Sequence, residues 1–430
     1  MACTAVWRYR DSLGQSPGNA LIQHSNALLR TALHLPYKLA RVVASWSIEV
    51  KGALRVAEKV VITGGAGFIG SHLADALLEL GHKVTAFDNS HPQIHGARQE
   101  PPAYLNPDVE FIRGDIRDDE ALQAALENKS VIFHLAAYTG VGQSMYQIQE
   151  YMDVNVQGTA GLLELLSQKA HQARKLILAS SRAVYGEGAY QCPHCGQVNS
   201  PPRSSAQLQA GSWEITCPHC HRQVKPVATP ESKTPDPQSI YAVSKQTQEQ
   251  VCLLVGETYN LPVSVLRFFN VYGPRQSLRN PYTGVLNTFI TRLLNGKPPQ
   301  VYEDGRESRD FVHVKDIVQA CLLAMTREES NGQIINVGSG QALSLLQAAQ
   351  TVARLLGGPE PVITGQYRAG DIRHCHADLN RARQLLGYAP GVMFEDGMRE
   401  LIDGLADQYW EDRSLVAEIE LQKRGLTGQV

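Results

Sequence analysis

The sequence of 430 residues has no excess of charge of either sign and lacks a long apolar segment. Lysine and arginine number 40 against 42 aspartate and glutamate residues, which gives a formal net charge of −2. No run reaches the roughly 18 apolar residues that a membrane-spanning helix needs. Balanced charge argues against a broad surface for nucleic acid or an anionic membrane. We therefore expect a cytoplasmic protein that binds small molecules, with neither a membrane nor a nucleic acid as partner.

Cysteine is also sparse, with eight residues in the chain. Four of them form two identical CPHC tetrads, at 192–195 and 217–220, and the other four are scattered. Paired CxxC motifs with isolated cysteines suit a reducing compartment better than a disulfide-stabilised secreted domain.

Residues 1–57 differ in composition from the rest of the chain. They contain seven lysine and arginine residues against two acidic ones, with abundant alanine, serine and leucine. One interpretation is an acid-poor targeting segment, and the other is a start codon assigned upstream of the true one. In either case we expect a disordered N-terminal extension outside the folded part.

A nucleotide-binding motif follows this extension. The stretch KVVITGGAGFIGSHLADALLELGHKVTAFDN (59–89) reads as a strand, a glycine turn, an amphipathic helix and a second strand. Gly64, Gly67 and Gly70 allow a tight turn that brings a pyrophosphate to the N-terminus of the helix. Asp88 ends the second strand, where its carboxylate can bind an adenosine ribose and would repel a 2′-phosphate. The pattern therefore predicts NAD rather than NADP.

Further apolar runs at 109–115, 130–137, 175–181 and 262–270 alternate with helical stretches. Near-continuous apolar runs are typical of strands buried on both faces of a parallel sheet. We therefore predict an α/β fold with a doubly wound parallel sheet. Its Rossmann domain is expected over 58–267, followed by a smaller α/β substrate-binding region over 268–430.

The motif YAVSK places Tyr241 and Lys245 one helical turn apart on the same face. A lysine ammonium stabilises a phenolate and lowers a pKa that is ordinarily near 10, which suits proton abstraction. Ser181 ends the predicted strand 175–181 and can hydrogen-bond the same substrate hydroxyl. On its own, YxxxK also fits an ordinary solvated helix face.

The chain resembles the extended short-chain dehydrogenase/reductases, specifically the NAD-dependent nucleotide-sugar epimerases and dehydratases. The resemblance covers about residues 58–410, interrupted at the CPHC segment, and rests on GGAGFIG, FDN, GDIRD, HLAA, VGQSM, NVQGT, ASSRAVYGEG, YAVSK, RFFNVYGPRQ, RDFVHVKD and YRAGDIRH. It implies that Ser181, Tyr241 and Lys245 are catalytic. The residues it implies for NAD are Gly64, Gly67, Phe68, Ile69, Gly70, Asp88, Asn89, Asp115, Ile116, Leu135, Ala136, Ala137, Asn155, Tyr241 and Lys245. Those it implies for the nucleotide sugar are Ser181, Asn270, Arg309 and Arg368.

The two arginines also make physical sense, because a guanidinium can meet a diphosphate with two parallel hydrogen bonds. Each arginine has an alternative as a structural ion-pair residue, since Asp310 and Asp371 are close in sequence.

The residues after Ser181 bear on the reaction. Related 4,6-dehydratases carry Asp and Glu at these positions for the elimination of water, whereas this chain has Arg182 and Ala183. The resemblance therefore implies a 4-epimerase that oxidises carbon 4 transiently and reduces it again. HPQIHG, VGQSMYQI and NPYTGVLNTFITRLLNG look most like the dTDP-L-rhamnose 4-epimerase group, which makes dTDP-6-deoxy-L-talose.

Several alternatives stay open. The substrate can instead be UDP-glucose or UDP-glucuronate, and a protein of this fold can also serve as an NAD-binding scaffold or RNA-binding protein. The resemblance further implies a homodimer, in which helices around 150–168 and 239–258 pair across the two-fold axis. Leu162, Leu163, Leu165 and Leu166 fit that interface and fit internal packing equally well.

The CPHC tetrads lie in an insert, residues 190–226, between Ser181 and Tyr241. Cys192 and Cys195 form one pair and Cys217 and Cys220 the other, with 21 residues (196–216) between them. This spacing predicts a zinc-ribbon-like fold around one structural zinc bound by four thiolates. Two disulfides or a redox CxxC are the alternatives. Because four sulfurs complete the coordination, we expect the metal to organise the insert rather than to activate substrate.

Overall fold

The computed structural model describes residues 57–96, 100–168, 171–278, 280, 282, 284–405 and 414–430. The extension predicted at 1–57 lies outside these ranges, apart from its last residue. Among the described residues, no helix has the length and apolar character needed to cross a membrane.

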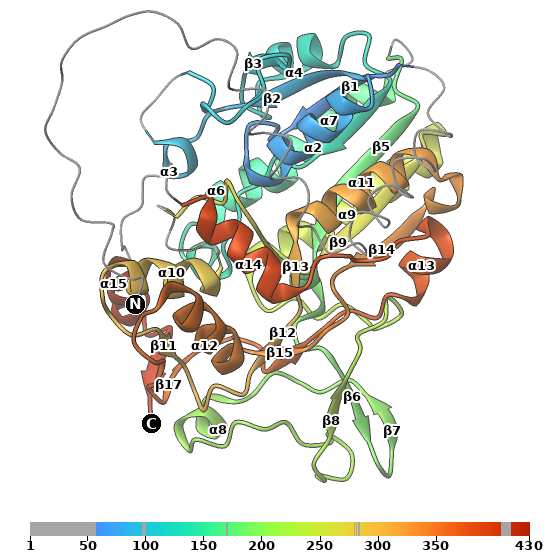
Figure 1. Cartoon of the computed structure of the whole chain (residues 1–430). Helices are drawn as coiled ribbons and strands as arrows, with labels where there is room; N and C mark the ends of the chain where they lie inside the picture. The colour runs from blue at the N-terminus through green and yellow to red at the C-terminus, as the bar shows by residue number, and fades with distance from the viewer. Residues whose placement is uncertain are drawn as a thin grey trace, which may run out of the picture. The chain divides into compact units, whose positions relative to one another are not determined.

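A seven-stranded parallel sheet forms the centre of the fold, with the strand order β14-β9-β5-β4-β1-β2-β3 (Figure 1). The strands are β1 (Lys59–Thr63), β2 (Lys83–Asp88), β3 (Glu110–Arg113), β4 (Val131–His134), β5 (Lys175–Ser181), β9 (Val263–Phe268) and β14 (Gln333–Val337). Every apolar run singled out in the sequence contains one of these strands. The predicted doubly wound α/β fold is confirmed.

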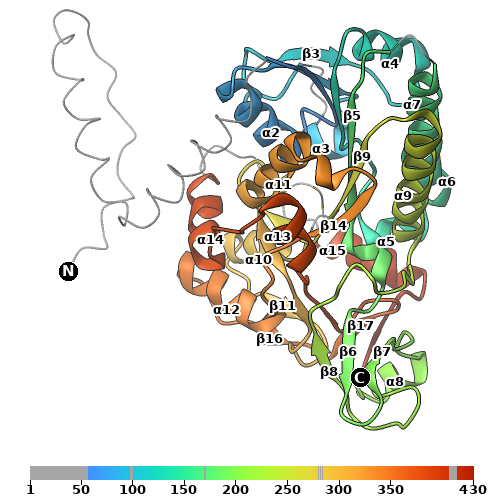
Figure 2. The ribbon, with the colours of Figure 1, turned by 90° about the vertical axis from the view of Figure 1, so that its right-hand side faces the viewer.

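Helices cover both faces of this sheet (Figure 2). α2 (Phe68–Glu79) and α11 (Val314–Thr326) pack on one face, and α4 (Asp119–Leu126), α7 (Gly158–Ser167) and α9 (Ile240–Tyr259) on the other. Each face has its own apolar core. Leu162, Leu163 and Leu166 belong to the second core and are 0%, 3% and 1% exposed, so these leucines serve packing within the chain.

The other described elements before the C-terminal part are short. They are α3 (Pro92–His95), α5 (Val141–Ser144), α6 (Ile148–Tyr151), the π-helix η2 (Met152–Gln157), the 3-10 helix η3 (Arg182–Tyr185), and β6 (Ala189–Cys192), β7 (Gly196–Val198), α8 (Ser205–Gln209) and β8 (Lys225–Val227) of the insert region. Several of them lie near the carboxyl ends of the central strands, where a doubly wound sheet binds its ligands.

The C-terminal part builds a third apolar core from α10, α12 and α14. Its elements are β10 (Asn270–Tyr272), α10 (Val285–Leu294), β11 (Gln300–Val301), β12 (Ser308–Arg309), β13 (Phe311–His313), η4 (Glu328–Ser330), β15 (Leu343–Ser344), α12 (Leu345–Leu356), β16 (Val362–Ile363), β17 (Gln366–Arg368), β18 (His374–Cys375), α13 (Asn380–Leu386), α14 (Phe394–Asp403), α15 (Ser414–Lys423) and β19 (Thr427–Gln429). α11 and β14 pack with the central sheet although they lie beyond residue 267, so the interval 58–267 does not contain every element of that sheet.

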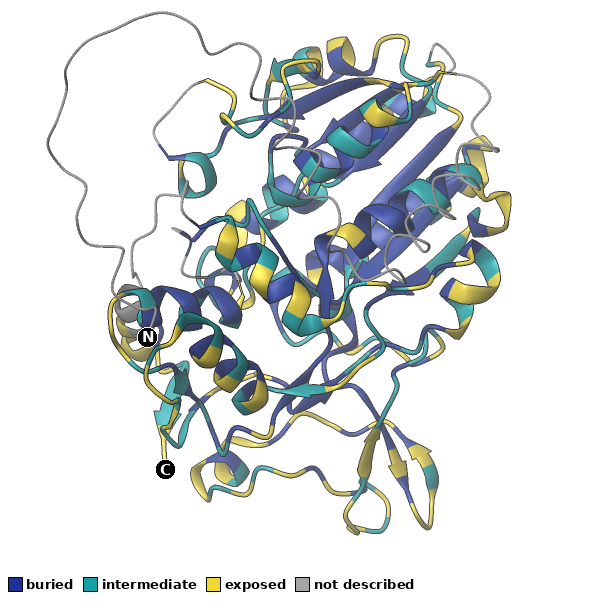
Figure 3. Ribbon diagram, in the orientation of Figure 1, coloured by how far each residue is buried: buried dark blue, intermediate teal, exposed yellow. Residues whose placement is uncertain are grey.

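The insert forms a small antiparallel sheet in the order β7-β6-β8, with α8 beside it. Its buried core consists of Tyr190, Cys192, Val198, Ile215 and Cys217. Much of the rest of the insert is exposed (Figure 3). The insert lies at the end of the molecule opposite β3, next to the C-terminal elements (Figures 1 and 2).

Candidate functional site

The turn between β1 and α2 leaves room for a phosphate group. Gly64 has a φ of 71°, and a Cβ there would lie 2.9 Å from the backbone nitrogen of Ala136. A Cβ at Gly70 would lie 2.4 Å from the Gly64 carbonyl oxygen. Gly67 is the N-cap of α2 and supplies no side chain to its first amides. This cradle fits a pyrophosphate at the helix N-terminus.

Polar side chains follow the neighbouring strands β2 and β3. The Asp88 carboxylate, 8% exposed, accepts hydrogen bonds from the backbone amides of Ala66 (3.1 Å) and Ser90 (2.9 Å). Asn89 donates to Asp115 over 3.1 Å. Hydrogen bonds from Arg117 and Asn89 lower the pKa of Asp115 to about 2 against the opposing effect of its burial. Asp88 is thus fixed beside the glycine turn, where an adenosine ribose binds in such folds.

Of the other residues predicted to bind the cofactor, some line the glycine turn and others hold the surrounding elements in place. Ala136 donates its amide to the Thr63 hydroxyl, which sets the Leu135–Ala137 run against the glycine turn. Asn155 is fully buried and bonds both the amide and the carbonyl of Tyr138, and it also donates to Ser244 of α9. Asn155 therefore ties the β4 loop to α9. Ile116 is 4% exposed and packs in the core with α7, whereas Phe68 and Ile69 begin α2 half-buried.

Ser181, Tyr241 and Lys245 come together at the carboxyl end of β5. Ser181 ends this strand, and Tyr241 lies in the first turn of α9, where Ser239 is the N-cap. The Ser181 side chain lies close enough to the Tyr241 phenol to lower the pKa of that phenol. Lys245, 3% exposed, donates to the Ala179 carbonyl oxygen over 2.9 Å. The predicted constellation is therefore assembled by one strand end and one helix.

Burial controls the charges of these groups. It raises the pKa of Tyr241, while the Ser181 hydrogen bond and the positive charge of Arg182 act in the opposite direction. Burial lowers the pKa of Lys245 to about 8, despite the nearby Cys252 and Glu249. A lysine with this pKa is still mostly cationic at neutral pH and can stabilise a phenolate.

A buried ion pair supports this site and was missed in the sequence. Arg267 of β9 donates to both carboxylate oxygens of Glu249 on α9, over 2.8 and 2.6 Å. Ser180 donates to the same carboxylate over 2.5 Å. Glu249 lies one turn after Lys245, so the pair fixes the α9 face that carries Tyr241 and Lys245. An arginine inside the apolar run SVLRF was the signal available in the sequence.

A second buried network joins β1, β4 and α7. The His134 ring lies 2.7 Å from the Thr63 hydroxyl through Nδ1 and 2.9 Å from the Thr159 hydroxyl through Nε2. Burial lowers the pKa of His134 to about 3, so the imidazole is neutral at physiological pH. Gln248 of α9 donates to Thr159 over 2.6 Å. These contacts fix the strand ends around the nucleotide cradle.

A pocket of about 100 Å³ is lined in part by residues that lie close to Ser181 and Tyr241 in the sequence. Its lining includes Arg182 and Ala183, Ser239, and the segment from Arg368 to Ile372, with Val141, Gly142, Met145, Gly186, Gln238, Leu421 and Leu426. Arg368 is exposed and stacks over the Tyr302 ring at 5.1 Å. Arg182 places a second positive charge in the pocket, a role that no motif in the sequence indicated.

The structure places the other two predicted substrate residues differently. Arg309 donates to the Asp371 carboxylate (3.1 Å) and to the carbonyl oxygens of Ile372 (2.7 Å) and Arg373 (3.0 Å). It thus makes the ion pair considered as its alternative, with Asp371. Asn270 begins β10, and its buried Oδ1 has no hydrogen-bond partner among the described residues.

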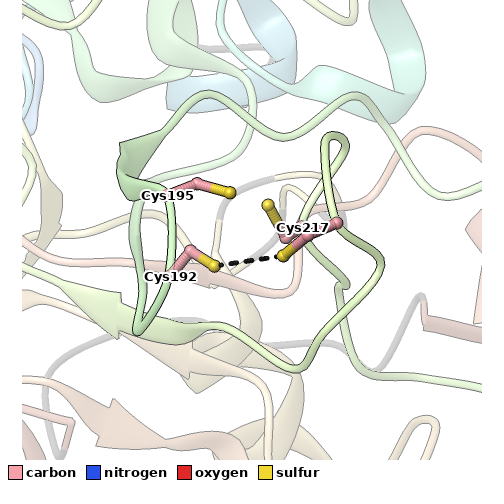
Figure 4. Close-up of side chains that lie close together, drawn as sticks. Cys192, Cys195 and Cys217 are labelled. Atoms are coloured by element: carbon pink, nitrogen blue, oxygen red, sulfur yellow. Dashed lines mark hydrogen bonds between the residues drawn. The ribbon is translucent and has the colours of Figure 1, made fainter.

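The four cysteines of the two tetrads meet in the insert. Their sulfur atoms all lie within 4.8 Å of one another, and those of Cys192 and Cys220 are 3.6 Å apart. Figure 4 shows the sulfurs of Cys192, Cys195 and Cys217 pointing toward one another. Among the described residues, these four cysteines are close enough together to bind one metal ion. The arrangement matches the donor set of a four-thiolate zinc site.

Comparison with known proteins places this chain in a family. Residues 60–338 match the model of the NAD dependent epimerase/dehydratase family. The chain is 36% identical to a dTDP-L-rhamnose 4-epimerase of Burkholderia thailandensis, over 84% of this chain and 98% of the relative. It is 31% identical to a UDP-N-acetyl-alpha-D-glucosaminuronate decarboxylase of Bacillus cytotoxicus, over 80% and 97%.

Solved structures of nucleotide-sugar 4-epimerases have a similar fold. The UDP-glucose 4-epimerase of Thermotoga maritima, in a structure with UDP-glucose, has a TM-score of 0.66 at 28% identity, covering 81% of this chain and 98% of that one. The UDP-glucuronic acid 4-epimerase of Bacillus cereus, in complex with UDP-glucuronic acid and NAD, has a TM-score of 0.65 at 28% identity, covering 82% and 100%. These relatives confirm the prediction of an NAD-dependent nucleotide-sugar epimerase. The chain belongs to the NAD-dependent epimerase/dehydratase family.

Proposed function

We propose that the protein is an NAD-dependent nucleotide-sugar 4-epimerase that interconverts dTDP-L-rhamnose and dTDP-6-deoxy-L-talose. The reaction type is supported by the cluster of Ser181, Tyr241 and Lys245 beside the pocket. The two residues after Ser181 are Arg182 and Ala183, where a dehydratase would carry an acidic pair. The 36% identical relative named dTDP-L-rhamnose 4-epimerase supports the substrate.

Separate residues would bind NAD and transfer the proton. Gly64, Gly67 and Gly70 would hold the pyrophosphate of NAD, and Asp88 its adenosine ribose. When bound, NAD supplies the reversible oxidation of carbon 4. Tyr241 accepts the proton of the 4-hydroxyl and later returns a proton to the oxygen at that carbon.

The neighbouring groups make this proton transfer feasible. Ser181 donates a hydrogen bond that orients the reacting oxygen, and the buried Lys245 stabilises the Tyr241 phenolate. Arg182 and Arg368 place positive charge in the pocket, where a diphosphate can accept their hydrogen bonds. The keto sugar must turn within the site between the two transfers, so that its other face is reduced.

The substrate is tested by incubating the purified protein with dTDP-L-rhamnose and, separately, with UDP-glucose and UDP-glucuronate. Proton NMR of the mixture distinguishes the 4-epimers. We expect a new dTDP-6-deoxy-L-talose signal that approaches equilibrium from either side. Conversion of a UDP-sugar alone would assign the protein to the UDP-sugar epimerases, to which the two solved structures described above also belong by name.

We also propose that Cys192, Cys195, Cys217 and Cys220 bind one structural zinc ion. Four thiolates at zinc-ligand distances of about 2.3 Å have sulfurs roughly 3.8 Å apart, and the 3.6 Å separation of Cys192 and Cys220 fits this value. With four sulfurs, the metal has no open position for water or substrate. Its role is to fold the insert, whose buried core is small.

The exposed apolar residues on α6 and α9 support the proposal of a homodimer. Ile148 is 50% exposed, and Val243 and Leu254 are 38% and 64% exposed. Val243 and Leu254 are eleven positions apart on one helix and therefore share a face. Exposed apolar side chains gathered on adjoining helices are typical of an interface between subunits.

A further inference from the structure

The insert is joined to the C-terminal part by two arginines that reach in opposite directions. Arg203 of the insert, with its side chain 1% exposed, donates to Glu303 over 2.7 Å. Arg373 of the C-terminal part is completely buried and donates to Glu214 of the insert over 2.5 Å. Arg373 also donates to the same Glu303 oxygen over 2.9 Å. Glu303 therefore connects both arginines in one buried network.

This network adjoins the segment that lines the pocket. Arg203 donates through Nη2 to the Asp371 carbonyl oxygen over 3.1 Å. From the other side, Arg309 donates to the Asp371 carboxylate and to the carbonyl oxygens of the next two residues. The turn at Asp371 is thus held between one arginine of the insert and one of β12. Asp371 and its neighbours Arg368 to Gly370 line the pocket.

A ring contact reinforces the same junction. Trp213 of the insert lies with its ring centroid 6.2 Å from that of Tyr367, the residue that precedes Arg368 in β17. The insert therefore touches this segment at both ends of the pocket-lining stretch. Buried charged hydrogen bonds are costly to break, so these contacts fix the segment more firmly than exposed ion pairs would.

We propose that Arg203 and Glu214 are positioning residues through which the insert holds the Arg368–Arg373 segment in its substrate-binding conformation. The insert thereby acts on nucleotide-sugar affinity and not on NAD binding, whose cradle is the glycine turn between β1 and α2. Neither residue lines the pocket, so both act through the segment that they contact. This inference rests on the proposed function for the identity of the ligand.

Arg203→Met tests the proposal, because it removes both donors to Glu303 and Asp371 while Glu303 keeps its bond to Arg373. We expect KM for the nucleotide sugar to rise about fivefold or more, with kcat changed less than about twofold. The NAD content of the purified enzyme should not change. Arg203→Lys keeps the positive charge but lacks the several N–H donors of a guanidinium, so it should give an intermediate KM.

Arg222→Met is the matched control, since Arg222 is an exposed arginine of the same insert; its KM should equal that of the wild type. If Arg203→Met does not fold, Glu214→Gln serves instead, because Arg373 keeps Asp304 as a partner over 2.7 Å. A folded variant with unchanged KM would overturn the proposal, and so would a loss of NAD together with a parallel fall in kcat.

Calorimetric titration with dTDP and UDP separates this inference from the proposed function. A wild-type protein that binds one of these nucleotides without epimerising any of the sugars contradicts the proposed function. In that case, weaker binding of the same nucleotide to Arg203→Met still supports the inference, and unchanged binding rejects it.

Discussion

At the scale of single residues, Tyr241 carries the chemistry that is most directly testable. Tyr241→Phe keeps the ring but removes the hydroxyl that we propose takes and returns the proton. We expect kcat to fall by about 10²-fold to 10⁴-fold, with NAD still bound. Tyr259→Phe is the matched control, because Tyr259 ends the same helix and is 53% exposed. Epimerisation at the wild-type rate by Tyr241→Phe would contradict the mechanism.

Glu307 gives a prediction about pH. It is 3% exposed, and its burial together with the nearby Glu303 raises its pKa from 4.5 to about 7. Asp371 acts in the same direction and Arg309 in the opposite one, and Arg373 Nη1 lies 3.8 Å from the carboxylate. Between pH 4.5 and about 7, the Glu307 carboxyl is protonated in the folded state and ionised in the unfolded state. The stability from this group is therefore complete below about pH 4.5 and is lost as pH rises through about 7.

Replacing this carboxyl removes that dependence. Glu307→Gln should be more stable than the wild type at pH 8, by on the order of 3 kcal/mol. The advantage should shrink at pH 5, where the wild-type carboxyl is protonated. Thermal unfolding at the two pH values measures the difference, with the exposed Glu360→Gln as control. An equal shift at both pH values would show that the effect is not electrostatic.

The sequence predicted those site residues whose geometry is local. Ser181 ends a strand, and Tyr241 and Lys245 share one helical turn, so motif spacing was enough to bring their chemistry together. Arg309 was different, because its partners are backbone carbonyls of residues 371–373, more than sixty positions away. The Arg373 to Glu214 contact joins two parts of the chain that no periodic pattern relates. Long-range pairs of this kind depend on how the elements pack.

Among the elements, the apolar runs of the sequence predicted six strands of the central sheet but not the edge strand β14. β1, β4, β5 and β9 are continuous apolar runs, since both of their faces are covered. β14, with the sequence QIINV, pairs with β9 from beyond the expected boundary at residue 267. The sequence of a strand does not show which strand it pairs with when many residues separate the two. Patterning alone therefore did not show that a strand beyond residue 267 joins the central sheet.

The proposed zinc site of the insert is tested by removing one of its ligands. Cys217→Ser removes one of four thiolates from the small core of the insert, and we expect the protein to lose its zinc and become sensitive to proteolysis within 190–226. Turnover should fall while the NAD content stays the same, because the nucleotide cradle lies elsewhere. Elemental analysis and limited proteolysis measure the two effects.

The matched control is Cys321→Ser, a buried cysteine of α11 outside the insert. It should keep its zinc. A wild-type protein purified without metal, or a Cys217→Ser variant with an unchanged proteolytic pattern, would argue against the zinc proposal.

At the scale of the whole molecule, the apolar face of α6 and α9 predicts the assembly. Leu254→Glu places a charge at the most exposed of its side chains, where it would be buried in a dimer without a partner. We expect light scattering to show a dimer for the wild type and a monomer for this variant. Val362→Glu is the control, because Val362 is 49% exposed on β16, away from this face. A Leu254→Glu variant that stays dimeric would place the interface elsewhere, and a monomeric wild type would rule out the dimer.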